Sequence, residues 1–133
     1  MVRIITDSAA DFEPHELEQL NVTCIPLSVM LGETEYQENV NLSKDQFFAL
    51  LAETGASPKT AQPAPTVLME LFAQAKQAGD EAVYITLSSA LSGTYQSAEM
   101  IREEAEYDGA YVLDSLNATG GQRMLVDYAV RLR

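Results

Sequence analysis

The sequence contains one cysteine, Cys24, and only 8 of its 133 residues are Lys or Arg. A single cysteine excludes an internal disulfide and a Cys-x-x-Cys zinc or redox motif. The 20 acidic residues leave a formal net charge of -12, which disfavours binding to nucleic acids and to anionic membrane surfaces. No apolar run approaches the roughly 18 residues of a membrane span, and no signal-peptide core precedes Asp7. These absences predict a cytoplasmic protein with one domain over residues 1–133.

Signatures of catalysis are also scarce. The sequence has no Walker loop, no G-x-G-x-x-G motif and no G-x-S-x-G nucleophile elbow. The only histidine, His15, is interpreted as an exposed surface residue of a short helix. Asp7 follows an apolar strand, as the nucleophile of aspartyl-phosphate chemistry does, but the next carboxylate is Asp11, too late for an Asp-x-Asp pair. We expect no metal site and no catalytic residue. A small phosphotransferase or hydrolase that uses Asp7 and nearby serine loops remains the alternative.

Strand and helix patterns alternate along the chain. Short runs rich in β-branched residues predict strands at 2–6, 22–31, 82–87 and 110–113. Pro26 indicates an edge strand or a bend within the second run. Helix starts and apolar faces predict helices at 14–20, after Ser43, from Pro65 to about Gly79, after Gly93 and after Gly121. Residues 32–41 have a turn-like composition, and residues 57–65 form a three-proline loop.

This alternation predicts an α/β fold in three layers, with a parallel sheet between two layers of helices. In such folds ligands bind beyond the carboxyl ends of the strands. Three predicted strands are followed by small hydroxyl residues, which lie at Ser8, at 88–94 and at 115–119. A single such residue is most simply a helix cap. Three groups at one sheet edge predict a binding site for a carboxylate or a phosphate.

Four motifs in this order resemble the N-terminal domain of the DegV family. They are the stretches 6–11 (TDSAAD), 60–63 (TAQP), 91–98 (LSGTYQSA) and 112–115 (VLDS), the last with Gly120 and Gly121. The third stretch is highly specific, whereas Asp-Ser strand ends alone are common. Together the motifs span nearly the whole chain.

The resemblance implies a carrier of long-chain fatty acids that has no catalytic activity and no cofactor of its own. In the family, such a protein is a subunit of bacterial fatty-acid kinase, and the partner kinase subunit phosphorylates the acyl carboxylate. The resemblance assigns the carboxylate to the hydroxyls of Thr60 and Ser92. The supporting residues that it implies are Asp7, Ser8, Gln62, Gly93, Thr94 and Ser115.

Two departures from the family pattern affect these expectations. Ala61 and Ala64 stand where the family has serines, so two hydroxyls are missing beside Thr60. The predicted last helix is still running at Arg133, whereas the family continues into a second domain that closes the lipid tunnel. We therefore expect residues 1–133 to fold, to bind fatty acid weakly without that domain, and to self-associate through the exposed apolar lining.

Overall fold

The main sheet has four parallel strands. The computed structural model describes residues 1–133, and its main sheet has the order β2-β1-β6-β7. The strands are β1 (Val2–Asp7), β2 (Val22–Ile25), β6 (Glu81–Thr86) and β7 (Ala110–Asp114). All three pairings are parallel. The predicted α/β class with a parallel sheet is therefore confirmed.

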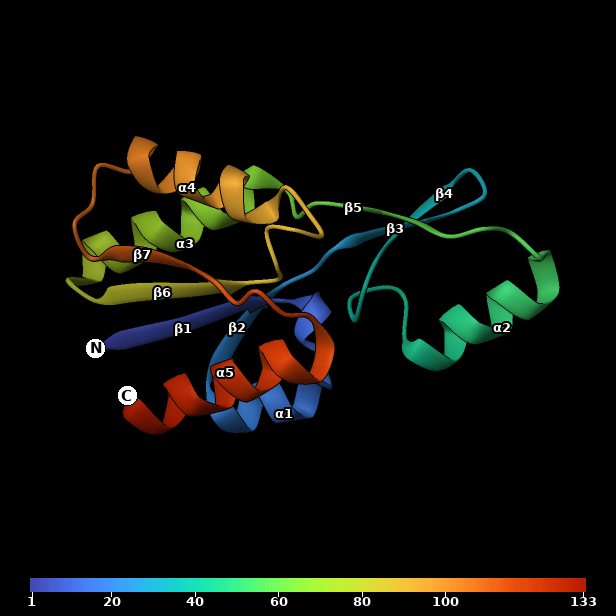
Figure 1. The fold of residues 1–133 in the computed structure, drawn as a ribbon, viewed down its shortest axis with the longest axis horizontal. Coiled ribbons are helices and arrows are strands. Elements are labelled where there is room, and N and C mark those ends of the chain that lie inside the picture. The colour runs from blue at the N-terminus through green and yellow to red at the C-terminus, as the bar shows by residue number, and fades with distance from the viewer.

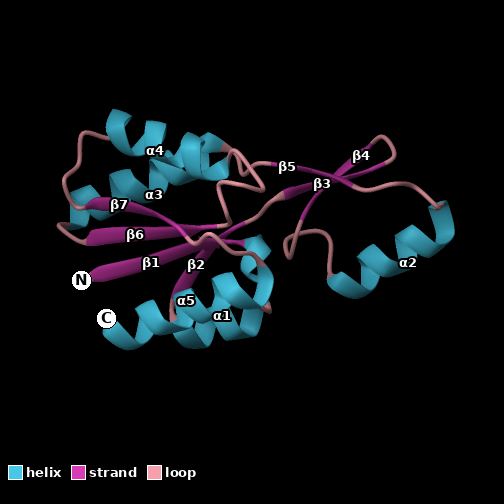
Figure 2. Ribbon diagram, in the orientation of Figure 1, coloured by secondary structure: helices cyan, strands magenta, loops and turns pink.

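Helices cover both faces of this sheet (Figures 1 and 2). One face carries α1 (Pro14–Leu20) and α5 (Thr119–Leu132), and the other carries α3 (Pro65–Ala78) and α4 (Thr94–Glu104). Proline opens both α1 and α3, because its fixed φ suits a first helical turn whose N–H groups have no partner within the helix. Gly79 ends α3 in the left-handed conformation. A short 3₁₀ helix, η1 (Ser8–Ala10), follows β1.

The core lies on the two faces of the parallel sheet. Under α3 and α4, eleven buried residues form one cluster that includes Phe72 and Tyr84. Under α1 and α5, six buried residues form a second cluster around Phe12 and Val126. Because both faces are covered, the central strands β1 and β6 alternate little in polarity and consist largely of buried residues. This packing fixes the carboxyl ends of the strands at one end of the sheet, the end that faces β3 and β5 (Figure 1).

Residues 28–61 form a smaller unit beside the parallel sheet (Figure 1), which we call the small lobe. It contains an antiparallel sheet of order β4-β3-β5 and the helix α2. The bounds are β3 (Ser28–Leu31), β4 (Thr34–Gln37), α2 (Lys44–Thr54) and β5 (Lys59–Ala61). Its buried apolar residues are Val29, Leu31 and Leu42. We call residues 1–27 and 62–133 the main body.

The small lobe corrects three sequence predictions. The run 22–31 is two strands in different sheets, because the chain leaves the parallel sheet after β2. Pro26 marks this change, and β2 is an edge strand, as Pro26 indicated. The stretch 32–41 is not only a turn, since it contains β4, and the three-proline loop contains β5. Both strands are short and mostly exposed, so they lack the apolar alternation that sequence analysis uses.

Candidate functional site

The loops after β6 and β7 are joined to each other at the carboxyl edge of the sheet. The Ser88 N–H donates to the Asn117 carbonyl oxygen at 2.7 Å, and the Ser89 N–H donates to Asp114 Oδ1 at 3.1 Å. Ser115 is buried, and its hydroxyl donates to the Asn117 carbonyl oxygen at 2.9 Å. Ser115, a predicted supporting residue, therefore shapes these loops through its own hydrogen bonds.

Asp7 is fully buried and its carboxylate already has four donors. Oδ1 accepts from the Ala9 N–H at 3.1 Å and from Gln122 Nε2 at 3.0 Å. Oδ2 accepts from the Leu87 N–H at 2.9 Å and, at 3.4 Å, from the Tyr84 hydroxyl. Burial raises the pKa of Asp7, and these hydrogen bonds lower it in part. Aspartyl-phosphate chemistry needs an exposed carboxylate, so this geometry argues against Asp7 as a nucleophile.

Two other predicted supporting residues also have internal partners. Ser8 is buried, and its Oγ accepts from the Leu27 N–H at 2.9 Å, where the chain enters the small lobe. Thr94 is the first residue of α4 and is also buried. Its Oγ1 lies 2.9 Å from Ser92 Oγ, and its N–H donates to Ser92 Oγ at 3.3 Å. Ser8 therefore connects two parts of the fold, and Thr94 holds Ser92 at the start of α4.

Ser92 is the predicted site residue that combines partial exposure with a place at a helix start. Its side chain lies directly before α4, whose first-turn N–H groups have no partner within the helix. The positive end of a helix dipole favours an anion at this position. The Ser92 hydroxyl therefore lies where a carboxylate would be stabilised.

Gln62 joins the second predicted motif to the same helix. Ser97 Oγ, in the first turns of α4, donates to Gln62 Oε1 at 2.7 Å. The Gln62 amide also lies against Gly93, so that a Cβ added at Gly93 would displace the Gln62 side chain from this position. The stretch 60–63 and the turn before α4 are therefore packed together although they are about 30 residues apart in the sequence.

Thr60 lies in β5, opposite Val29 of β3. It is exposed and borders a cavity of about 250 Å³ in the small lobe. Val29, Leu42 and Phe47 form the apolar part of the lining, and Glu38 and Lys44 lie at its polar side. No hydrogen bond joins Thr60 to Ser92. The structure thus connects the two predicted carboxylate-binding segments through the contacts of Gln62 with Ser97 and Gly93.

Sequence reasoning missed the role of Gln122. This residue is fully buried in α5, and its Nε2 donates to Asp7 Oδ1 and to Thr6 Oγ1 at 3.0 and 3.1 Å. A signal was present, because Gln122 is four residues before the buried Val126 and so lies on the inward face of the helix. A polar residue on such a face usually has a buried partner.

The structure contains neither a candidate metal site nor a candidate membrane-spanning helix. No group of three or more His, Cys, Asp and Glu side chains is arranged to hold a metal ion. None of the helices combines the length and the apolar composition that crossing a bilayer requires.

A family model and several relatives match this chain. The DegV family model, described as an uncharacterised protein of the DegV family, matches residues 1–133. The chain belongs to the DegV family. A DegV domain-containing protein of Caldanaerobacter subterraneus is 34% identical over 98% of this chain and 46% of the relative. One of Clostridium perfringens is 33% identical over 98% of this chain and 47% of the relative.

Solved DegV-family structures have the same fold. A stearic-acid-binding protein of Eubacterium ventriosum superposes with a TM-score of 0.91 at 31% identity, covering 99% of this chain and 47% of that protein. The fatty-acid-binding DegV of Bacillus subtilis gives a TM-score of 0.88 at 28% identity, with coverages of 98% and 46%. Both of these solved proteins are described as fatty-acid-binding. This chain spans about half the length of the relatives that it matches.

Proposed function

We propose that this DegV-family chain binds a long-chain fatty acid and that Thr60 and Ser92 hold its carboxylate. The contact of Gln62 with Ser97 and Gly93 carries the proposal, because it fixes the 60–63 stretch against the start of α4. Hydroxyl donors and unpaired helix N–H groups make stronger hydrogen bonds to an ionised carboxylate than to a neutral group. The fatty acids bound by the Eubacterium and Bacillus relatives support the ligand class.

The lipid ligand is tested first without any substitution. Mass spectrometry of the purified 133-residue chain should detect copurified long-chain fatty acid, in a smaller amount than for a longer relative, since part of the acyl chain stays exposed to water. Titration of a fluorescent fatty acid into the purified chain measures the affinity of the chain for this ligand class. Sedimentation at several concentrations tests the expected weak self-association. Binding of other ligand classes in place of fatty acid would contradict the proposal.

The two hydroxyls are tested in a chain long enough to bind tightly. For this we join residues 1–133 to the remaining part of the Caldanaerobacter relative and call the product the extended chain. Ser92→Ala and Thr60→Val should each weaken fatty-acid binding about tenfold or more, because a hydrogen bond to a charged group contributes roughly 1.5–3 kcal/mol. Ser57→Ala and Thr66→Val, at exposed positions, are the matched controls. Unchanged affinity in Ser92→Ala would remove this hydroxyl from the site.

We further propose that the bound carboxylate is presented to a partner kinase subunit in the cytoplasm. The kinase transfers the terminal phosphoryl group of ATP to a carboxylate oxygen, which yields an acyl phosphate and ADP. The saturated hydrogen bonding of Asp7 supports a carrier without turnover of its own. The purified chain should show no phosphatase, esterase or ATPase turnover. Turnover that disappears in Asp7→Asn would establish the phosphotransferase or hydrolase alternative instead.

A further inference from the structure

The small lobe is joined to the main body by two short crossings that lie side by side. The first crossing is 26–27, between β2 and β3, and the second is 62–64, between β5 and α3. Ser28 and Ala61, the lobe residues next to these crossings, are paired in the antiparallel sheet. Neighbouring strands of a sheet lie about 5 Å apart. Because both connections pass through one narrow place, they allow the lobe to rotate about a common axis.

Each crossing is fixed to the main body by one side-chain hydrogen bond. The Leu27 N–H donates to Ser8 Oγ at 2.9 Å, and Ser97 Oγ donates to Gln62 Oε1 at 2.7 Å. Each crossing also contains a proline, whose ring fixes φ. Backbone rotation is therefore concentrated on the lobe side of the two anchored residues, where β3 begins and β5 ends. We call these two points the hinge.

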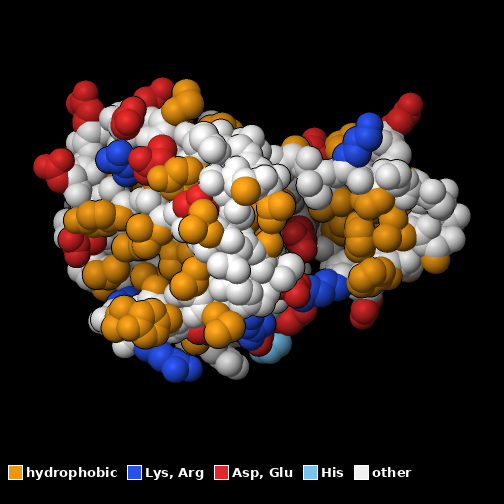
Figure 3. All heavy atoms as spheres, viewed as in Figure 1, with side chains coloured by type: hydrophobic (Ala, Val, Ile, Leu, Met, Phe, Trp, Pro, Cys, Tyr) orange, Lys and Arg blue, Asp and Glu red, His pale blue; other side chains and the backbone are white.

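The small lobe and the main body have separate cores. No buried apolar cluster contains residues of both regions. No helix or strand of the lobe packs extensively against a helix or strand of the main body. Figure 3 shows the molecule narrowing between the two regions. The lobe can therefore rotate about the hinge without exposing a buried core, and polar contacts are the main obstacle to that rotation.

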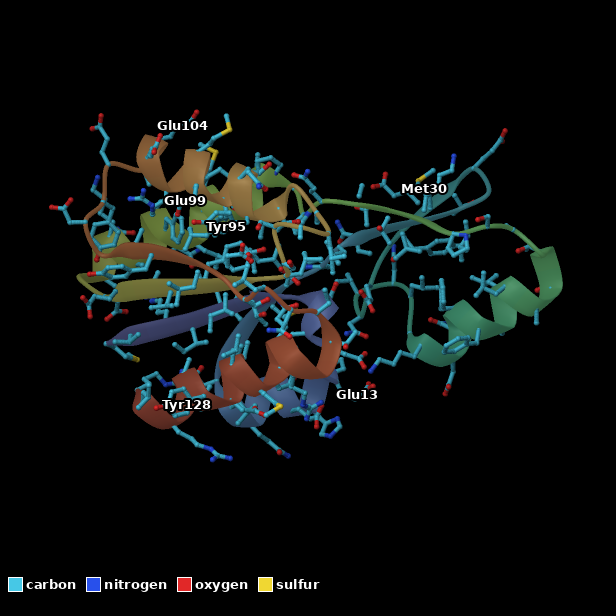
Figure 4. The ribbon with its side chains drawn as sticks, viewed as in Figure 1. Glu13, Met30, Tyr95, Glu99, Glu104 and Tyr128 are labelled. Atoms are coloured by element: carbon cyan, nitrogen blue, oxygen red, sulfur yellow. The ribbon has the colours of Figure 1, made fainter.

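Lys44 is at the centre of those polar contacts. Its Nζ lies 2.9 Å from Asp11 Oδ1 and 2.6 Å from Glu13 Oε1. Figure 4 shows Glu13 on the side of the main body that faces α2. Lys44 is the first residue of α2, where the positive end of the helix dipole disfavours a cation. The helix itself thus gives no reason for a lysine at this position, whereas the two carboxylates do.

The main-body half of this contact is held firmly. Phe12, between the two carboxylates in the sequence, is buried, and the Arg123 guanidinium lies 4.5 Å from the centre of its ring. The Glu13 N–H donates to Glu16 Oε2 at 2.8 Å. From the lobe, Asn39 Nδ2 adds one hydrogen bond to the Phe12 carbonyl oxygen at 3.2 Å. The two carboxylates therefore belong to a fixed surface, and only the lobe half of the contact moves.

We propose that the small lobe is a hinged cover of the site that contains Ser92, and that the ion pairs of Lys44 hold this cover closed. The lobe faces the end of the main sheet at which Ser92 precedes α4 (Figure 1). Thr60 is one residue before the end of β5, so rotation about the hinge moves α2 far more than Thr60. Opening therefore widens access to the site. The motion belongs to the chain without ligand, and only the nature of what enters rests on the proposed function.

Distances between two spin labels test the hinge in the 133-residue chain without ligand. In a Cys24→Ser background, the labels are attached at Gln19→Cys in α1 and Glu53→Cys in α2, both at exposed positions. Lys44→Met should raise the ratio of the longer-distance to the shorter-distance population about 2- to 30-fold, the range expected for the loss of two exposed ion pairs. The same single distance with and without Lys44→Met would overturn the hinge.

Two further substitutions separate the ion pairs from other effects of Lys44→Met. Lys59→Met makes the same change in net charge within the lobe, but Lys59 forms no salt bridge, so the distances should not change. Lys44→Arg keeps a cation that reaches both carboxylates and should retain the closed population. Equal shifts in Lys44→Met and Lys59→Met would overturn the role of Lys44.

Ionic strength provides a second arm, in which Lys44 is kept. Raising it from about 0.1 M to about 1 M shortens the Debye length from about 10 Å to about 3 Å and weakens exposed ion pairs. The ratio of longer to shorter distances should then rise at least about twofold in the labelled chain with Lys44. In Lys44→Met the ratio should not respond to salt. Identical salt responses of the two chains would contradict closure by these ion pairs.

Binding kinetics in the extended chain test whether the lobe covers the site. When entry requires the open state, Lys44→Met speeds both association and dissociation of a fluorescent fatty acid, by up to the factor by which the open population rises. Lys59→Met should leave both rates unchanged. Unchanged rates in Lys44→Met would show that the lobe moves without covering the site, which overturns the cover. Absence of fatty-acid binding in every variant would instead contradict the proposed function, whereas the label distances decide the hinge without any ligand.

Discussion

The main body and the small lobe differ in how they are held together. The main body has two buried clusters, of eleven and six residues, on the two faces of its sheet, whereas the small lobe buries only three apolar residues. Helix α2 has no buried residue at all. The candidate site combines both regions, since Ser92 belongs to the main body and Thr60 to the small lobe. Ser92 thus lies in the more extensively packed region, and Thr60 in the region with fewer buried contacts to resist local unfolding.

Few polar contacts hold the small lobe to the main body. Lys44, at the start of α2, pairs with Asp11 at 2.9 Å and with Glu13 at 2.6 Å. Asn39 Nδ2 donates to the Phe12 carbonyl oxygen at 3.2 Å. Glu38 lies at the same junction, and burial raises the pKa of its carboxyl group. These contacts help to fix the position of the small lobe, which contains Thr60, relative to the main body, which contains Ser92.

The largest expected difference concerns one phenylalanine in each region. Phe72 of α3 is fully buried, and Phe72→Ala should lower the free energy of unfolding by about 3–5 kcal/mol. Phe47 of α2 is only partly buried, so Phe47→Ala should lower the free energy of unfolding by clearly less than Phe72→Ala does. Urea unfolding followed by circular dichroism measures both. Equal losses would show that the small lobe is as tightly packed as the main body.

Asp7 provides the next effect, within the main body. Asp7→Asn replaces one acceptor oxygen by an NH₂ group, which would point at a hydrogen-bond donor. The substitution should therefore lower the free energy of unfolding by about 1–3 kcal/mol. The pKa of Asp7 is higher in the folded protein than in the unfolded chain, so the folded protein binds the proton of this carboxyl group more tightly. Asp7 therefore makes the free energy of unfolding decrease as the pH rises from the ordinary pKa of an aspartate through the raised pKa of the folded state. The variant should lose that slope. Asp45→Asn, in exposed α2, is the control, and an equal loss there would contradict the assignment.

Lys44→Met tests the connection between the two regions. Exposed ion pairs contribute about 0.2–1 kcal/mol each, so the global stability should change little. Amide exchange in β3 and β5 should nevertheless become faster, while exchange in β1 and β6 stays the same, because only the small lobe loses its anchor. Lys59→Met is the control, since Lys59 forms no salt bridge. Faster exchange throughout the molecule would mean that the two regions unfold together.

The smallest effect is the acid dependence of one ion pair in the main body. The hydrogen bond from Arg123 lowers the pKa of Glu16 to about 2, from an ordinary value of 4.5. Its stabilising contribution is present above 4.5 and is lost as pH falls toward 2. Glu16→Gln should remove that part of the acid dependence, and Glu18→Gln should retain it. The unfolding temperature of both variants is measured between pH 2 and pH 4.5. Identical pH dependence in the two variants would show that the Glu16–Arg123 pair does not contribute to acid dependence.

The sequence predicted the main body well. Helices after Pro14 and Pro65 and the four strands of the parallel sheet follow from local signals: proline at a first turn, glycine after a last turn, and apolar runs of strand length. The small lobe was largely missed, because β4 and β5 are short and exposed and are stabilised by pairing with β3. Their formation depends on partners distant in the sequence, which no local pattern records.

The motifs themselves determined the family and the segments that contain Thr60 and Ser92. Only the tertiary structure decided what each hydroxyl and carboxylate does. Asp7 and Ser115 looked alike as polar strand ends, but both are buried: the Asp7 carboxylate accepts from Gln122 and Leu87, and the Ser115 hydroxyl donates to the Asn117 carbonyl oxygen. Ser92 keeps partial exposure at the start of α4. Whether a polar side chain supports the fold or meets a ligand depends on which partners the packing brings within hydrogen-bond distance, and those partners come from segments far apart in the chain.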